Sequence, residues 1–192
     1  MQSRPVKRIE DVKRLKENQF PEDAGPMSHP IRPESFIEIN NFYTMTIYEK
    51  GAEVIRMIET LIGKENFKKG MTKYFELFDG QAVTTEDFVK AMELASGKNL
   101  SQFKNWYSRS GTPTLKIRSQ QDGKITKLKI TQEYPKTPLT APAGNILHVP
   151  LKLAFYNENG TEILHEKLIE LTQLEEEFEF HLTGKVIHSC VS

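Results

Sequence analysis

The spacing of apolar residues changes near Gly111, and this change restricts the folds that are open to the chain. Before Gly111, apolar residues recur three and four positions apart, which is typical of amphipathic helices. After Gly111 they alternate with polar residues, which is typical of half-buried antiparallel strands. The boundary itself carries a turn signal, Ser110-Gly111-Thr112-Pro113. We therefore predict an α-then-β chain, with one part over residues 1–111 and a second over residues 112–192.

The first part is expected to hold helices separated by a proline-rich loop. A polar stretch over residues 6–20 reads as a helix, and four prolines from Pro21 to Pro33 exclude a long regular element after it. An apolar stripe from Thr46 to Ile62 predicts a second helix that ends at Gly63. Further helices are predicted at residues 67–78, after an N-cap at Thr84 or Thr85, and around Phe103, Trp106 and Tyr107.

The second part is expected to form a small antiparallel β-sandwich. Leu128 and Ile130 alternate with Lys127 and Lys129, as in a strand with one buried face. Glycine-containing turns at residues 122–123 and 159–160 indicate hairpins. Short strands at this density are typical of a sandwich. The predicted strands cover residues 114–118, 124–132, 148–156, 161–170, 176–182 and 185–190.

The charge balance excludes several classes of partner. The 26 Lys and Arg residues equal the 26 Asp and Glu residues, so there is no electrostatic basis for binding nucleic acid or an anionic membrane. No apolar run approaches the roughly 18 residues of a membrane-spanning helix. The single cysteine, Cys190, cannot form an internal disulfide, which excludes a disulfide-stapled secreted scaffold. We expect a cytoplasmic protein with no nucleic-acid or membrane partner.

The histidines show no zinc-binding pattern. His165-Glu166 begins like the H-E-x-x-H motif, which places two imidazoles one helical turn apart. The fifth position is Ile169, and the segment reads as a strand, in which positions i and i+4 lie about 13 Å apart. The sequence also lacks a phosphate-binding glycine loop, a dinucleotide fingerprint and a serine-nucleophile elbow. Residue patterns alone therefore predict the fold class without indicating a chemistry.

One stretch resembles a known family. Residues 40–52, which contain Tyr48-Glu49-Lys50-Gly51, resemble the region around the catalytic tyrosine of the gluzincin-type zinc aminopeptidases. Residues 26–33, 54–58, 67–71 and 106–113 resemble the bacterial aminopeptidase N family in the same order along the chain. The resemblance is nearly continuous over the first part and looser over the second. A single tetrad would be weak, whereas five segments in the same order are specific.

The resemblance implies roles for three residues. In the family, the tyrosine before Glu-Lys-Gly donates its phenol hydrogen to the oxyanion of the tetrahedral intermediate, and that role falls on Tyr48. A donor aimed at developing negative charge in a dry site contributes roughly 3–4 kcal/mol. Asn40 and Tyr43 match positions on the substrate side of the family's cleft, with Tyr43 as a wall of the pocket for the first side chain. Without such roles, both tyrosines would be core aromatics and Asn40 a turn or cap residue.

The resemblance also implies a metal whose ligands this sequence lacks. The family binds zinc through H-E-x-x-H and a later glutamate, and it holds the substrate's amino terminus with a glycine-methionine-glutamate motif. Both precede the tyrosine segment in the family, and neither occurs in this sequence. We therefore expect an internal fragment: the C-terminal helical part of a thermolysin-like catalytic domain, followed by a small Ig-like antiparallel β-sandwich. Zinc belongs to the complete enzyme and is not expected on this chain, and the lack of a signal peptide carries no information for a fragment.

Two functions remain open from the sequence. As part of a zinc aminopeptidase, the chain would act on the N-terminal residues of peptide substrates, would need the missing N-terminal catalytic segments as its partner, and would be inactive alone. The alternative is a non-catalytic interaction module built from a helical block and an Ig-like domain. An in-frame H-E-x-x-H upstream of Met1 in the DNA would favour the first function, and its absence would favour the second.

Overall fold

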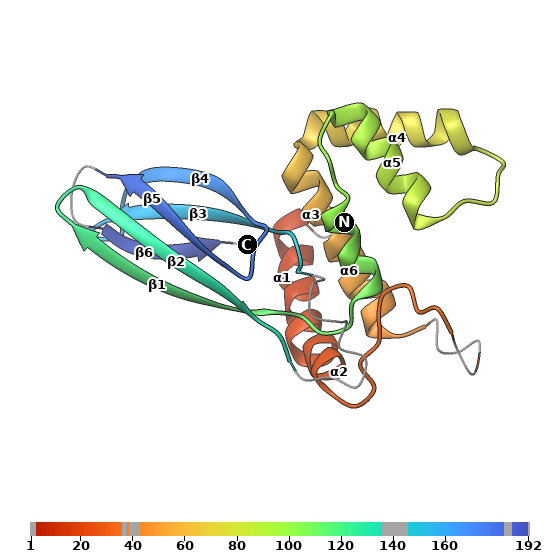
Figure 1. The fold of residues 1–192 in the computed structure, drawn as a ribbon, viewed down its shortest axis with the longest axis horizontal. Coiled ribbons are helices and arrows are strands. Elements are labelled where there is room, and N and C mark those ends of the chain that lie inside the picture. The colour runs from red at the N-terminus through yellow and green to blue at the C-terminus, as the bar shows by residue number, and fades with distance from the viewer. Residues whose placement is uncertain (1–2, 36–37, 39–42, 136–145, 183–185, 192) are drawn as a thin grey trace. The chain divides into compact units, whose positions relative to one another are not determined.

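Helices and strands occupy separate parts of the chain in the computed structural model (Figure 1). The structure describes residues 3–35, 38, 43–135, 146–182 and 186–191. Contacts within the chain separate a helical unit, which runs to Thr112, from a β unit, which starts at Pro113. The predicted order of helices followed by antiparallel strands is confirmed. None of the described helices combines the length and the apolar character that a membrane span requires.

The helical unit combines α-helices with π-helical and 3-10 turns. The Asp87 carboxylate accepts hydrogen bonds from the amide and the hydroxyl of Thr84, each at 2.9 Å, which makes Thr84 the N-cap. Gly63, at φ 79°, ends a helix where the sequence predicts it. The elements are α1 (Arg4–Arg14), η1 (Leu15–Gln19), α2 (Phe20–Ala24), η3 (Thr46–Lys50), α3 (Gly51–Ile62), α4 (Lys64–Phe78), α5 (Thr85–Ser96), η4 (Gln102–Lys104) and α6 (Asn105–Ser108).

The first helix continues beyond its predicted end. Residues 15–19 form the π-helical turn η1, and α2 then includes Pro21, so the prediction that Pro21 begins the loop is wrong. Proline lacks an amide hydrogen, and its ring clashes with the carbonyl four residues earlier in a regular helix. In η1 the amide of Phe20 donates to the carbonyl of Leu15, five residues earlier. This wider spacing ends the hydrogen-bond pattern of α1, so that α2 begins as a new helix. Pro21 lies in the first turn of α2, where no amide donor is required.

The core of the helical unit comes mainly from α3 and α5. Val54 and Ile58 of α3 are fully buried, as are Val89 and Met92 of α5. Helix α4 lies beside α5 (Figure 1). Gly70 is the one buried residue of α4 and faces Met92. The absence of a side chain at Gly70 therefore allows the two helices to approach closely.

The β unit consists of two three-stranded antiparallel sheets, with strand orders β1-β2-β5 and β4-β3-β6. Gly123 and Gly160, at φ 57° and 66°, occupy the two predicted hairpin turns and adopt the left-handed conformation that favours glycine. The strands are β1 (Thr114–Asp122), β2 (Ile125–Glu133), β3 (Val149–Asn157), β4 (Ile163–Leu171), β5 (Glu175–His181) and β6 (Val186–Val191).

Side chains from both sheets form one core. Leu128 and Ile130 of β2 are buried, whereas Lys127 is exposed and Lys129 is half-buried. This is the alternation that the sequence predicts. Phe155 of β3 and Phe180 of β5 belong to different sheets, and their ring centroids lie 4.7 Å apart. Aromatic rings at this separation are in direct contact. The two sheets therefore pack face to face as a sandwich.

Candidate functional site

Tyr43 and Tyr48, two of the three residues that the sequence assigns to a site, lie together on the helical unit. Their side chains are 69% and 57% exposed. Their ring centroids lie 6.2 Å apart, with 23° between the ring planes. Asn40, the third residue, lies outside the described residues. In this chain, neither tyrosine contributes to the hydrophobic core.

Tyr48 is the middle residue of the π-helical turn η3. The amide of Gly51 donates to the carbonyl of Thr46, five residues earlier, which is the spacing of a π-helix. Thr46 and Lys50 lie four residues apart on one face of the turn, and both are buried. Tyr48 lies two residues from each and is exposed. Short π-helical turns of this kind occur frequently at functional sites.

Acidic residues one and five positions after Tyr48 pair with arginines of α1. Glu49 lies 3.1 Å from the guanidinium of Arg14. Glu53 accepts two hydrogen bonds from Arg8, one of them at 2.9 Å. A two-point arginine–carboxylate pair fixes direction as well as distance. These pairs hold η3 and α3 against α1.

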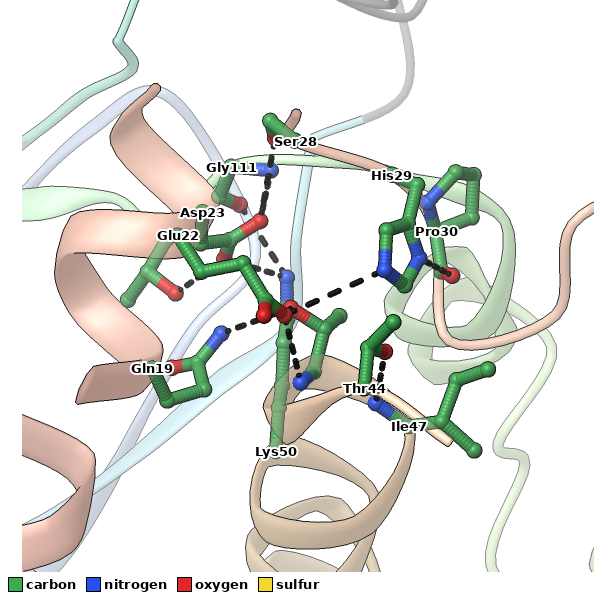
Figure 2. A network of polar contacts seen from close by, with 12 residues as sticks. Gln19, Glu22, Asp23, Ser28, His29, Pro30, Thr44, Ile47, Lys50 and Gly111 are labelled. Carbon is green, nitrogen blue, oxygen red and sulfur yellow. Dashed lines mark hydrogen bonds and ion pairs between the residues drawn. The ribbon is translucent and has the colours of Figure 1, made fainter. Parts of the chain in front are cut away.

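The side chain of Lys50 runs into the interior of the helical unit, where it meets Asp23 of α2 (Figure 2). Lys50 Nζ lies 2.8 Å from Asp23 Oδ2 and 3.5 Å from the carbonyl oxygen of Gly111. The amide of Gly111 donates to Asp23 Oδ1 at 2.8 Å. Asp23 also accepts hydrogen bonds from the hydroxyls of Thr112 at 2.7 Å and Ser28 at 3.2 Å. One buried carboxylate therefore joins α2, η3 and the segment that follows α6.

Burial and pairing act on both ionisable groups of this contact. Burial raises the pKa of Asp23, but the charge of Lys50 and the hydrogen bonds from Lys50, Thr112 and Gly111 outweigh burial, so the pKa lies below its ordinary value of 3.8. Burial lowers the pKa of Lys50 below its ordinary value of 10.5; Asp23 opposes this effect and Arg109 adds to it. The surroundings of Asp23 therefore favour its ionised carboxylate.

Glu22, the residue before Asp23, binds the start of the same turn. Glu22 Oε1 accepts hydrogen bonds from the amide of Thr46 at 2.8 Å and from the Thr46 hydroxyl at 2.6 Å. A carboxylate at the N-terminal end of a helix is favoured by the helix dipole. Gln19 Nε2 lies 3.4 Å from the Thr46 hydroxyl, and His29 Nε2 lies 3.9 Å from Glu22 Oε1 (Figure 2). The start of η3 is therefore fixed by polar groups from α2 and its neighbours.

The described residues do not offer a site for zinc. No group of three His, Cys, Asp or Glu side chains in the described part of the chain could hold a metal ion. His165 and Glu166 are neighbours on strand β4, where successive side chains point to opposite faces. His148 is engaged by Glu170, with 2.8 Å between Nε2 and Oε2. The zinc that the family resemblance implies therefore does not fit these residues.

The two carboxylates that hold η3 were not predicted from the sequence. Glu22 and Asp23 lie in a stretch predicted as loop, and they belong to none of the recognised motifs. The one available signal was Lys50, because a lysine within an apolar helical pattern requires an acidic partner if it is buried. The sequence does not reveal which of the 26 acidic residues is that partner.

Comparison with known families divides the chain in two. Residues 4–107 match the peptidase family M1 domain. Residues 111–192 match a domain of unknown function with an Ig-like fold, DUF3458. The Tyr48 turn and the carboxylates Glu22 and Asp23 all lie within the first match.

Several relatives match nearly the whole chain. Aminopeptidase N of Haemophilus influenzae is 51% identical over 189 residues, which covers 93% of this chain and 22% of that protein. Aminopeptidase N of Escherichia coli is 48% identical over 187 residues, covering 93% and 21%. The crystal structure of Legionella pneumophila aminopeptidase A in complex with aspartic acid matches with a TM-score of 0.74 and 29% identity, covering 94% of this chain and 21% of that one. The chain therefore spans about a fifth of the length of these relatives.

Proposed function

The chain belongs to peptidase family M1, and from this membership we propose that it forms part of a zinc-dependent aminopeptidase in which Tyr48 stabilises the oxyanion. The observation that carries the proposal is the placement of Tyr48, a largely exposed phenol on a helical turn whose other face is buried and hydrogen-bonded. The aminopeptidase N relatives, at 51% and 48% identity, support the class of reaction.

The hydroxyl of Tyr48 supplies one element of peptide hydrolysis. When water attacks a peptide carbonyl, negative charge develops on the carbonyl oxygen, and a phenol hydroxyl can donate a hydrogen bond to it. Because this charge is largely absent from the bound substrate, the hydrogen bond strengthens in the transition state and raises kcat. Loss of one such donor lowers kcat by about 10²–10³.

We also propose that Tyr43 and Asn40 line the substrate side of the site. The near-parallel arrangement of the Tyr43 and Tyr48 rings supports this for Tyr43, because a substrate that reaches one ring passes close to the other. The role of Asn40 rests on the family resemblance. The substrates in this proposal are peptides with a free amino terminus.

The proposal assigns the zinc ligands and the catalytic base to segments outside these 192 residues. The described residues hold no metal-binding cluster, and the relatives are about five times as long as the region they share with this chain. Those further segments are therefore the proposed partner of the chain, and the isolated chain is proposed to be inactive. A cytoplasmic location belongs to the same proposal and is supported by the single cysteine.

A chimeric enzyme provides the test. In it, this chain replaces the matching 189 residues of Haemophilus influenzae aminopeptidase N, and turnover of an alanine anilide is measured. Tyr48→Phe is expected to lower kcat by about 10²–10³ with KM within about twofold, because only the hydroxyl is removed. Tyr74→Phe makes the same change on α4, among Phe78 and Phe88, and is expected to retain kcat. Full kcat in Tyr48→Phe, or no turnover by the unsubstituted chimera, would reject the proposal.

A further inference from the structure

We infer that Glu22 and Asp23 are positioning residues for Tyr48: adjacent carboxylates of α2 that hold the two ends of turn η3. We call this pair the carboxylate clamp. The inference rests on the proposed function, since the direction of the Tyr48 hydroxyl affects turnover only if that hydroxyl meets the substrate. Both carboxylates bind Thr46 or Lys50, so they act on Tyr48 through the turn.

The clamp binds Thr46 and Lys50, the first and the last residue of η3; Figure 2 labels both carboxylates and Lys50. Glu22 holds Thr46 through two hydrogen bonds, at 2.8 and 2.6 Å. Asp23 holds Lys50 through a buried ion pair at 2.8 Å. Consecutive residues of a helix point about 100° apart, so two neighbouring side chains of α2 diverge and reach both ends of one turn. This arrangement fixes the length of the turn as well as its position.

The clamped face of η3 is opposite the face that presents Tyr48. Thr46 and Lys50 are 0% and 4% exposed, whereas Tyr48 is 57% exposed. Side chains two residues apart on a helix do not face each other, while those four apart do. The hydrogen bonds that fix the turn therefore leave the Tyr48 ring accessible to a substrate.

A π-helical turn needs such support because regular α-helix is the more favourable form. In a conversion of η3 to α-helix, each hydrogen bond would span four residues instead of five. The side chains before the turn would then rotate by about 100° relative to those after it. Tyr48 would then point away from its present direction. By fixing both ends of η3, the clamp opposes this conversion.

The clamp is itself anchored. Asp23 is 1% exposed and accepts hydrogen bonds from the Gly111 amide, the Thr112 hydroxyl and the Ser28 hydroxyl in addition to Lys50. A surface ion pair without such anchors would hold its partners loosely. The position of Tyr48 is therefore tied to the interior of the helical unit.

The test measures kcat and KM of the chimeric enzyme for Glu22→Leu, which removes the oxygen that accepts both hydrogen bonds from Thr46, and for Asp23→Asn, each alone and combined with Tyr48→Phe. Each single substitution is expected to lower kcat by about 10–100-fold with KM within about twofold, because displacing a catalytic group by about 1 Å can cost 10²-fold. In the Tyr48→Phe background, the same substitutions are expected to change kcat by less than about threefold, because the hydroxyl that they position is already gone.

A second measurement does not depend on turnover. The 192-residue chain carries 3-fluorotyrosine at position 48, and its ¹⁹F resonance is recorded for each clamp variant. Glu22→Leu and Asp23→Asn are expected to shift or broaden this resonance. Val89→Ala, which opens space in the fully buried part of α5, is the control for lost stability; it is expected to leave both the resonance and kcat unchanged. If Asp23→Asn does not fold, Glu22→Leu decides the outcome, since the Glu22 side chain is 25% exposed and its replacement leaves no buried charge without a partner.

The outcomes separate the inference from the proposed function. If Tyr48→Phe retains kcat, the proposed function fails, and the fluorine spectra alone decide whether the clamp orients Tyr48. If Tyr48→Phe loses kcat while the clamp variants retain it, the inference fails and the function stands. The inference also fails if the clamp variants lower kcat by the same factor with and without the Tyr48 hydroxyl, or if the resonance responds equally to Val89→Ala.

Discussion

The ammonium group of Lys50 lies 2.8 Å from the carboxylate of Asp23, and the two side chains are only 4% and 1% exposed. Removing one partner of such a pair leaves the other charge buried, which is strongly unfavourable. Asp23 has three further hydrogen-bond donors, in Ser28, Gly111 and Thr112. Lys50 is held by Asp23, by a longer contact of 3.5 Å to a carbonyl oxygen and by the face of the Trp106 ring, and among these contacts only Asp23 carries a negative charge. Lys50 therefore depends on Asp23 more than Asp23 depends on Lys50.

Because Lys50 depends more on Asp23 than Asp23 does on Lys50, replacing Asp23 is expected to destabilise the chain more than replacing Lys50. Asp23→Asn is expected to lower the free energy of unfolding by about 3–5 kcal/mol, because it leaves the Lys50 ammonium buried without its counter-charge. Lys50→Met is expected to lower it by about 1–3 kcal/mol, because Asp23 keeps its other donors. Urea unfolding can be followed by the fluorescence of Trp106, the only tryptophan, whose ring centroid lies 5.9 Å from Lys50 Nζ.

The matched control is a lysine of an exposed ion pair. Lys73 lies 3.3 Å from Glu76 on α4, and both side chains are about half exposed. Lys73→Met is expected to change stability by less than about 0.5 kcal/mol. The double variant Asp23→Asn with Lys50→Met should lose less than the sum of the two single variants. Equal losses for the single variants, or additivity in the double variant, would contradict the asymmetry.

The lowered pKa of Asp23 predicts that acid removes its contribution to stability. Because the pKa of the folded carboxyl lies below the ordinary value of 3.8, the unfolded chain takes up the proton at a higher pH than the folded chain does. The stabilisation is therefore complete well above pH 3.8 and is lost as the pH falls through the folded value. The measured quantity is the difference in unfolding free energy between the unsubstituted chain and Asp23→Asn. It is expected to be constant from pH 7 to about pH 5 and to shrink at lower pH; a difference that grows in acid would contradict the assignment.

Elements defined by nearby residues were predictable from the sequence. The helices α3, α4 and α5 follow apolar stripes and end at local signals such as Gly63, and the hairpin turns contain Gly123 and Gly160. Strand β1 extends to Asp122, four residues beyond its predicted end, because it pairs with β2 down to the contact between Asp122 and Ile125. This last stretch is polar and lacks the alternation that marks a strand, so backbone pairing alone extends it.

The support of the candidate site was not predictable, because its contacts join residues that are distant in the sequence. Tyr48 was found through its neighbours in the chain. Glu22 and Asp23 bind groups that lie 24 and 27 positions away, and no local pattern encodes that pairing. The π-helical form of η3 depends on the same contacts, whereas the apolar stripe from Thr46 predicts only a continuous helix.

Because α4 and α5 approach closely at Gly70, the effect of Gly70→Ala on stability is expected to change sign when Met92 is also replaced. A Cβ at Gly70 would overlap Met92 Sδ and lie 3.3 Å from Met92 Cε, and Met92 is fully buried. Overpacking of this kind costs about 1–3 kcal/mol, which exceeds the gain of about 1 kcal/mol that alanine brings to a helix interior. Gly70→Ala is therefore expected to lower the free energy of unfolding, measured by urea denaturation. In a Met92→Ala background the clash is absent, so Gly70→Ala should raise stability by about 0.5–1 kcal/mol. The same sign in both backgrounds would show that the helices do not meet as described.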